Sequence, residues 1–290
     1  MNEYDSSERS RLARRAFLKT TNIVGLSAAA ATLMGANRLM AAATPKGIPV
    51  DTPSQIFTAA LVAEDLATTF YYNGLVGGVI QDPNLAGPGG TANDPKPTDS
   101  NPGNVNYLQA ALYQEIQHAN LLRSLLGISS PSSDPYQTFY FPAGVFETLT
   151  PFINLLEALE NAFIGAYSIA AFEFAQLAAF TAVEQITYKK MGMYTPDDQE
   201  YFAEVAATIL GVESEHRVLG RVISSANPAN NLNYESTDGL TSVYDGANSA
   251  VAALTPFLTS STGPAYSLAN ALSGAASVYI VTSGSPPPQM

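Results

Sequence analysis

Apolar residues recur every three to four positions along four stretches of the chain, which is the spacing of amphipathic helices. These stretches are rich in Ala, Leu, Glu and Gln, and they cover residues 54–72, 106–126, 151–167 and 196–223. The third starts at Pro151, a residue suited to the first turn of a helix, and it either extends or resumes over 172–190. Before the fourth, Thr195 is a predicted N-cap, followed by Pro196 and two acids.

Two long connections separate these helices. Residues 81–104 are dense in Pro, Gly, Asn and Asp, and residues 127–151 have the same character with aromatic residues added. Long amphipathic helices joined in this way predict an all-α four-helix bundle with long crossover loops over residues 44–226. Residues 227–290 are rich in Ser, Ala, Gly and Asn, and we expect a C-terminal extension with helices near 244–258 and 266–277 and a disordered tail.

The first 43 residues are predicted to be an export signal rather than part of the fold. Arg14 and Arg15 precede Phe-Leu-Lys and a mildly apolar stretch over 20–34, and Ala41, Ala42 and Ala43 provide a cleavage site of small residues. This segment resembles a twin-arginine (Tat) signal, which implies a periplasmic or extracellular protein that is exported folded. No uninterrupted apolar run reaches the ~20 residues that span a bilayer, so no stable membrane insertion is expected.

Charge and composition limit the kinds of functional site that this chain can form. The chain has 25 acidic and 13 basic residues, a formal net charge of −12, so the phosphates of a nucleic acid would be repelled. Cysteine is absent, which excludes disulfides, thiolate metal sites and a cysteine nucleophile. Glu, Asp, His and Tyr remain as the chemical groups of a site.

Both histidines of the chain lie in Glu-x-x-His motifs, formed by Glu115 with His118 and by Glu213 with His216. Residues three apart share one face of a helix, so each pair can reach a common metal centre. Glu64, the one Glu of the first helix, also falls on an apolar face. The third helix offers several candidates, which are Glu157, Glu160, Glu173 and Glu184.

Two Glu-x-x-His pairs and one Glu from each of two other helices form the di-iron or di-manganese site of ferritin-like bundles. The chain resembles the ferritin-like superfamily over about residues 52–224, and in particular the secreted ferritin-like domain proteins related to plant desiccation-associated proteins. The segments that carry the resemblance are Ala63-Glu64-Asp65-Leu66, residues 115–122, Leu159-Glu160-Asn161 with Gly165-Ala166-Tyr167, and residues 212–216.

The resemblance implies a metal site built from Glu64, Glu115, His118, Glu160, Glu213 and His216. A direct antiparallel hairpin turning near Met193 would instead place Glu173 level with Glu213, so the choice between Glu160 and Glu173 stays open. Four carboxylates and two neutral imidazoles carry a charge of −4, which two divalent cations would neutralise, and no Lys or Arg lies on the stripes that hold these residues.

The expected cofactors are two Fe or two Mn ions, which suit carboxylate and imidazole ligands. The resemblance implies redox chemistry with O2 or peroxide, either ferroxidase-like or catalase-like. The alternative is a non-catalytic metal-binding or stress- and desiccation-protection protein that uses the bundle as an interaction scaffold. A homo-oligomer is possible under either hypothesis. Tyr71, Tyr72, Tyr113 and Tyr167 fall near the predicted site, where core packing is their default role and electron relay a hypothesis.

Overall fold

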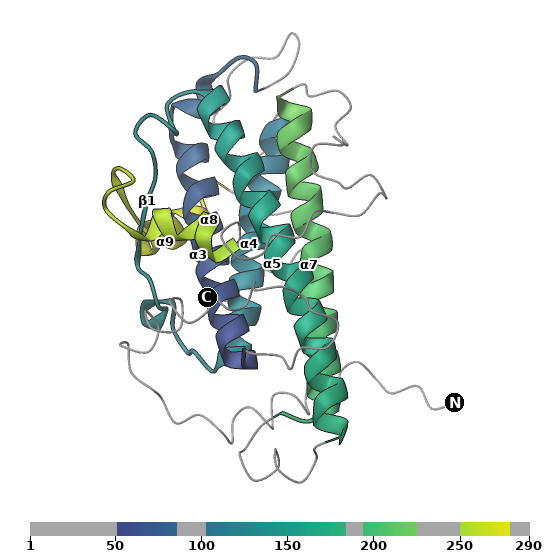
Figure 1. The fold of residues 1–290 in the computed structure, drawn as a ribbon. Coiled ribbons are helices and arrows are strands. Elements are labelled where there is room, and N and C mark those ends of the chain that lie inside the picture. Colours follow the sequence, from purple (N-terminus) through teal and green to yellow (C-terminus); the bar gives the residue numbers. More distant parts are fainter. Residues whose placement is uncertain (1–50, 86–102, 184–193, 225–249, 279–290) are drawn as a thin grey trace.

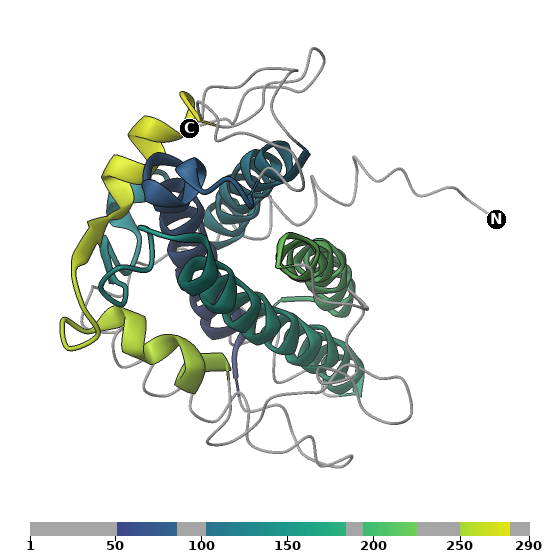
Figure 2. The same cartoon turned by 90° about the horizontal axis from the view of Figure 1, so that it is seen from above.

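The computed structural model describes residues 51–85, 103–183, 194–224 and 250–278 (Figure 1). Four long helices run side by side as a bundle: α3 (Pro53–Val76), α4 (Gly103–Leu126), α5 (Leu149–Val183) and α7 (Pro196–Ile223). Helix α3 packs chiefly on α4, and α5 on α7, so the bundle is a pair of helical hairpins (Figure 2). The predicted all-α bundle is therefore confirmed, whereas the predicted export signal and the C-terminal tail lie outside the described residues.

Local sequence explains where the helices begin. Thr52 and Gln55 form a reciprocal capping box at the start of α3, and Thr195 and Asp198 form another at the start of α7. In both cases proline follows the cap directly, where its missing N–H costs no helical hydrogen bond. The predicted N-cap Thr195 is confirmed. Helix α5 is continuous to Val183, so the third predicted helix extends rather than resumes, and residues 184–190 lie outside the described part.

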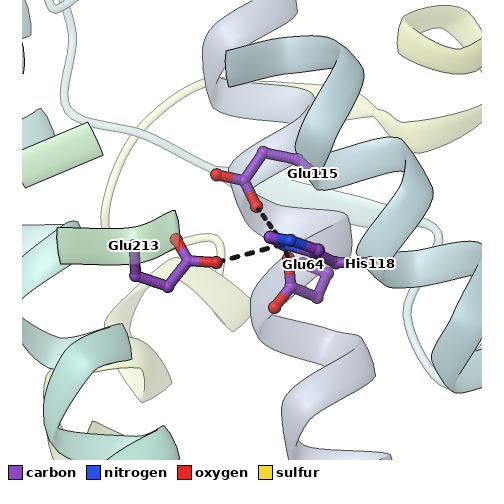
Figure 3. A group of neighbouring side chains, drawn as sticks. All are labelled: Glu64, Glu115, His118 and Glu213. Carbon is purple, nitrogen blue, oxygen red and sulfur yellow. Dashed lines mark hydrogen bonds and ion pairs between the residues drawn. The ribbon is translucent and has the colours of Figure 1, made fainter. Parts of the chain in front are cut away.

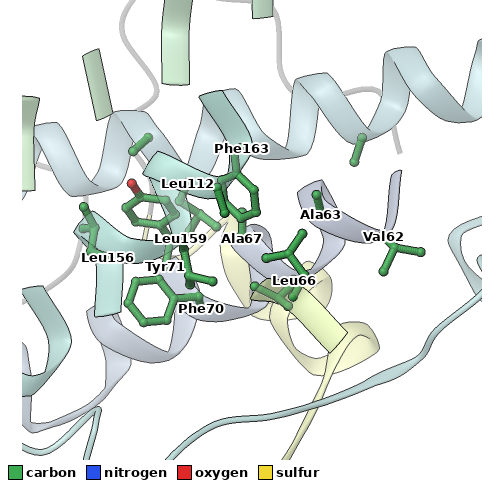
Figure 4. Close-up of a cluster of buried hydrophobic side chains, with 14 of the residues drawn as sticks. Val62, Ala63, Leu66, Ala67, Phe70, Tyr71, Leu112, Leu156, Leu159 and Phe163 are labelled. Atoms are coloured by element: carbon green, nitrogen blue, oxygen red, sulfur yellow. The ribbon is translucent and has the colours of Figure 1, made fainter. Parts of the chain in front are cut away.

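The hydrophobic core fills the space between the helices on both sides of the predicted site. Figure 4 shows part of it, where Leu66 and Phe70 of α3 meet side chains of α4 and α5. The rings of Phe70 and Phe152 stack with centroids 4.6 Å apart. Gly74, one turn after Phe70, allows this packing, because a Cβ there would lie 2.3 Å from the Phe152 ring. Burial of this kind, at about 25 cal/mol per Å² of apolar surface, holds the two hairpins together.

The C-terminal extension packs on the outside of α3 and α5 (Figures 1 and 2). Its elements are α8 (Ala250–Leu254), the 3-10 turn η6 (Thr255–Leu258), β2 (Ala265–Ser267) and α9 (Leu268–Ala275). Strand β2 pairs antiparallel with β1 (Thr138–Tyr140) of the loop before α5, with Phe139 opposite Tyr266. Helix α9 lies against α3 at Gly274, where a Cβ would meet the Tyr72 hydroxyl at 2.1 Å. The remaining short elements are the 3-10 turns η2 (Gly78–Gln81) and η3 (Pro131–Ser133).

The helix bounds predicted for this extension differ in detail from those observed. The helix expected over 244–258 is described from residue 250, and beyond Leu254 it tightens into a 3-10 turn that contains Pro256. The helix expected over 266–277 begins at Leu268, because the residues before it pair with β1.

Within the described residues, one helical stretch, 149–179, has the length and hydropathy of a membrane-crossing segment. In its most apolar window 61% of the residues are buried inside the bundle. The core helix of a globular bundle has the same properties, so this stretch is only weak evidence for a membrane span.

Candidate metal centre

The six predicted side chains converge between the four long helices. Glu64 comes from α3, Glu115 and His118 from α4, Glu160 from α5, and Glu213 and His216 from α7, and all are buried. Their oxygen and nitrogen atoms form two groups, each with its members within 4.8 Å of one another. Figure 3 shows the first group, in which three carboxylates from three helices surround one imidazole.

In the first group the contacts converge on His118 Nδ1. This atom lies 3.1 Å from Glu213 Oε1, 3.2 Å from Glu64 Oε2 and 3.7 Å from Glu115 Oε2 (Figure 3). A ring nitrogen facing three carboxylate oxygens at such distances forms a pocket of donor atoms of the kind that a divalent cation takes in proteins.

The second group repeats this arrangement around His216. Its Nδ1 lies 2.9 Å from Glu115 Oε1, 3.4 Å from Glu213 Oε2 and 3.9 Å from Glu160 Oε2. Glu115 and Glu213 thus belong to both groups, and each presents one oxygen to one histidine and its other oxygen to the other. Glu64 and Glu160 belong to one group each. Two carboxylates in the middle and one at either end make a two-centre site.

The geometry decides between the two candidate ligands of α5, Glu160 and Glu173. Glu173 is buried on the same helix but falls in neither group, and burial with Asp51 nearby raises the pKa of its carboxyl to about 8. In the described residues Glu160, and not Glu173, lies level with Glu213: α5 continues to Val183, 23 residues after Glu160, whereas α7 begins at Pro196, 17 residues before Glu213. At about 1.5 Å per residue, α5 runs roughly 9 Å farther beyond the cluster than α7 does.

A glutamine orients the ring of His216. His216 Nε2 lies 2.8 Å from Gln114 Oε1, which can only accept, so the ring donates through Nε2, and in the neutral imidazole Nδ1 then presents a lone pair to the cluster. Metal-binding histidines use such a partner on the second ring nitrogen to fix the tautomer and the ring plane. Sequence analysis missed Gln114, since an amide next to a ligand is not a distinctive pattern.

Two tyrosines hold the terminal glutamates. Tyr71 of α3 donates to Glu160 Oε1 of α5 at 2.5 Å, and Tyr167 of α5 donates to Glu64 Oε1 of α3. Each bond crosses between the hairpins, and each leaves the other carboxylate oxygen directed at a histidine. Core packing is therefore an incomplete account of these two residues. The signal was present in the sequence, because Tyr71 and Tyr167 each lie seven positions after Glu64 and Glu160.

Three arginines that the sequence analysis did not single out are buried in the bundle. Arg123 of α4 and Arg217 and Arg221 of α7 are at most 4% exposed. Arg123 is neutralised locally, since it lies 2.5 Å from Asp65 Oδ1 and 2.8 Å from Asp134 Oδ2. Arg217 donates to the Asn161 side-chain oxygen at 3.3 Å. These residues were missed because they lie at the edge of the apolar stripes rather than on them.

Burial and mutual repulsion set the charges of the cluster. Burial first, and then the neighbouring carboxylate of Glu213, raise the pKa of Glu64 and Glu160 well above the usual range. Burial also opposes charge on Glu115, but the attraction of the two nearby histidines outweighs it and holds the pKa of this carboxyl below its usual value. The same carboxylates raise the pKa of His118 and His216, against the effect of burial. Without cations, protons must compensate the charge here.

Several buried oxygen and nitrogen atoms of the cluster have no hydrogen-bond partner of good geometry. These are both oxygens of Glu115 and of Glu213, Glu160 Oε2 and His216 Nδ1. These atoms lie 2.9 to 3.4 Å from one another without good hydrogen-bond geometry, and buried polar atoms left in this way are costly. A cation placed among them would satisfy all of these atoms, so the residues present fit a pair of metal ions.

Comparison with known proteins agrees with this architecture. Residues 52–190 match the family model of the ferritin-like domain, which covers α3, α4 and the described length of α5, and it ends before the Glu-x-x-His motif of α7. Searches of curated proteins and of solved structures found no match to the chain. Residues 52–190 are therefore similar to the ferritin-like domain, and the all-α bundle is consistent with that domain.

Proposed function

We propose that the cluster binds two divalent iron or manganese ions and uses them for redox chemistry with O2 or peroxide. One observation carries this proposal: Glu115 and Glu213 each direct one oxygen to His118 and the other to His216. A structural ion needs one closed set of donors. Two sets that share their central carboxylates suit two ions held close together, with Glu64 and Glu160 as the terminal ligands.

The charges and ligand types support these metals. Four carboxylates and two neutral imidazoles balance two divalent cations, and Arg123 is already engaged by Asp65 and Asp134. Oxygen and imidazole donors without thiolates favour Fe, Mn or Zn over Cu(I). The paired site with bridging carboxylates favours the redox-active metals of ferritin-like bundles.

When bound, such a pair of ions would supply two-electron chemistry, either the reduction of O2 to H2O2 with two electrons and two protons, or the conversion of two H2O2 to O2 and two H2O. The chain's own part is to hold and shield the site. Tyr71 and Tyr167 fix one oxygen of each terminal glutamate, and Gln114 fixes the ring of His216. Apolar layers above and below exclude bulk water, which strengthens every interaction between charges in the cluster.

The cellular setting is part of the same proposal. The twin-arginine pair and cleavage site in residues 1–43 lead us to propose export to the periplasm or beyond, after the metal has been loaded in the folded protein. A relationship to desiccation-associated proteins and assembly into a homo-oligomer stay predictions. They are compatible with a redox role, because removal of O2 or peroxide also protects a stressed cell.

The first experiment is elemental analysis of the full chain purified from its export route, followed by anaerobic loading with Fe(II) and exposure to O2 or H2O2. We expect about two ions per chain and rapid oxidation of both. His216→Ala should abolish the reaction, whereas Glu173→Gln, which changes a buried carboxyl of α5 outside the cluster, should leave it intact. No bound metal and no uptake of Fe(II) or Mn(II) would overturn the proposal and favour the scaffold function.

A further inference from the structure

An apolar pocket lies beside the candidate metal site, between the bundle and the C-terminal extension. It has a volume of about 50 Å³ and is bounded by α3 and α5 on the bundle side and by α8 and η6 on the other. Its lining includes Ala60 and Ala63 of α3, Ala166 and Tyr167 of α5, and Val251 and Leu254 of α8. Small side chains on both long helices leave this space unfilled, and α8 and η6 cover it.

Tyr167 connects the pocket to the cluster. Its ring lines the pocket, and its hydroxyl donates to Glu64 Oε1, so one side chain touches both spaces. Ala63, which also lines the pocket, directly precedes Glu64 in α3. A molecule held in the pocket would therefore contact a side chain that is hydrogen-bonded to the candidate ligand Glu64.

The lining determines what the pocket can bind. Apart from Thr255 and the ring of Tyr167, its side chains are Ala, Val, Ile and Leu, and the Tyr167 hydroxyl is already used by Glu64. Peroxide or water would lose hydrogen bonds to bulk water on entering and regain few. The volume is about one third of the ~150 Å³ at which a dry apolar cavity takes benzene, so it suits a molecule of two or three heavy atoms.

We propose that this pocket binds a small apolar molecule of the size of dioxygen and holds it next to the metal cluster. The binding itself is independent of the metal. Its role in delivering O2 to the cluster rests on the proposed function, and it deepens that function by favouring O2 over peroxide as the oxidant. The alanines are then specificity-determining residues, since a larger side chain at any of them would fill the space that the ligand needs.

Xenon is the probe for the binding site, because it is apolar, gas-sized and needs no metal. We expect the metal-free full chain to bind xenon in this pocket, as seen by 129Xe NMR or in crystals under xenon pressure. Ala166→Leu should abolish binding, whereas Ala171→Leu, an equally half-buried position of α5 outside the pocket, should not. Val251→Phe fills the same space from α8 and guards against a folding defect in the first variant. Absence of xenon, or equal binding in all variants, would overturn the proposal.

A second measurement tests delivery. In Fe(II)-loaded protein, Ala166→Leu should raise the apparent KM for O2 at least fivefold while oxidation by H2O2 keeps its rate and the iron content stays at two. Equal effects on both oxidants, or no effect on O2, would overturn the delivery role. Xenon binding in a protein that takes up no metal would support the pocket and overturn both the delivery role and the proposed function, so the two failures are distinguishable.

Discussion

The shared glutamates and the terminal glutamates should differ in what their loss does to metal content. Glu115 belongs to both donor groups and Glu64 to one. We therefore expect Glu64→Gln to weaken the binding of one ion and to leave about one ion per chain. Glu115→Gln should weaken the binding of both ions. Because burial raises the pKa of Glu64 well above its usual range, glutamine mimics the protonated form and should preserve the metal-free fold.

The size of the expected loss in metal affinity follows from the charge that each variant removes. Removing one carboxylate leaves two divalent ions with one uncompensated positive charge in a buried site. Breaking a buried ion pair by removal of one partner costs about 3–5 kcal/mol, which corresponds to roughly 150- to 5,000-fold in affinity. An ion at 100 times its Kd stabilises the folded state by about 2.7 kcal/mol, so two ions should raise the Tm by about 10–20 °C at this chain length. We expect about half of that rise in Glu64→Gln and little in Glu115→Gln.

The assay is anaerobic titration with Mn(II) or Fe(II), with elemental analysis after desalting and a thermal melt of each sample. Glu160→Gln should repeat the behaviour of Glu64→Gln at the opposite end of the cluster, and Glu213→Gln that of Glu115→Gln. Glu173→Gln is the control and should retain two ions. Full-affinity binding of one ion by Glu115→Gln, or loss of both ions in Glu64→Gln, would refute the two-centre arrangement.

Three further predictions concern residues around the cluster. Tyr167→Phe should still bind two ions, but one of them about 10- to 100-fold more weakly because Glu64 loses its hydrogen bond, whereas Tyr113→Phe should leave metal affinity and turnover unchanged; the titration above checks both. The pKa of Glu173 is raised from 4.5 to about 8, so the folded state keeps a proton that the unfolded chain has lost, and stability falls as pH rises from 4.5 to 8. Glu173→Gln should match the wild type at pH 4 and exceed its unfolding free energy by about 1–3 kcal/mol at pH 8.5, and parallel pH curves from urea unfolding would contradict this. Asp65→Ala should lower the free energy of unfolding by about 3 kcal/mol, because buried Arg123 loses its 2.5 Å contact with Asp65 and keeps those with Asp134 and Asn120. A loss below about 1 kcal/mol in urea unfolding would show that the pair is weak.

Much of the architecture could be predicted because helices leave a periodic trace in the sequence. The start of α7 at Thr195 followed from its cap, its proline and its acids, and these are local interactions. The offset between α5 and α7 could not be predicted in the same way, because periodicity shows which face of a helix is buried but not how far one helix slides along another. That offset decides between Glu160 and Glu173, and only the resemblance selected Glu160. Strands β1 and β2 have three residues each, too few for an alternating pattern.

The tyrosines show what the sequence held but periodicity did not reveal. The two hairpins repeat the same chemistry at a nearly constant separation: 96 positions relate Glu64, Asp65 and Tyr71 to Glu160, Asn161 and Tyr167, and 98 relate Glu115, His118 and Arg123 to Glu213, His216 and Arg221. Each tyrosine bonds the glutamate of the other hairpin, and each shared glutamate faces both histidines. Neither hairpin can therefore complete a metal position alone. The cluster depends on how α3 and α4 pack against α5 and α7, so a substitution that loosens this interface should release metal before any helix unfolds.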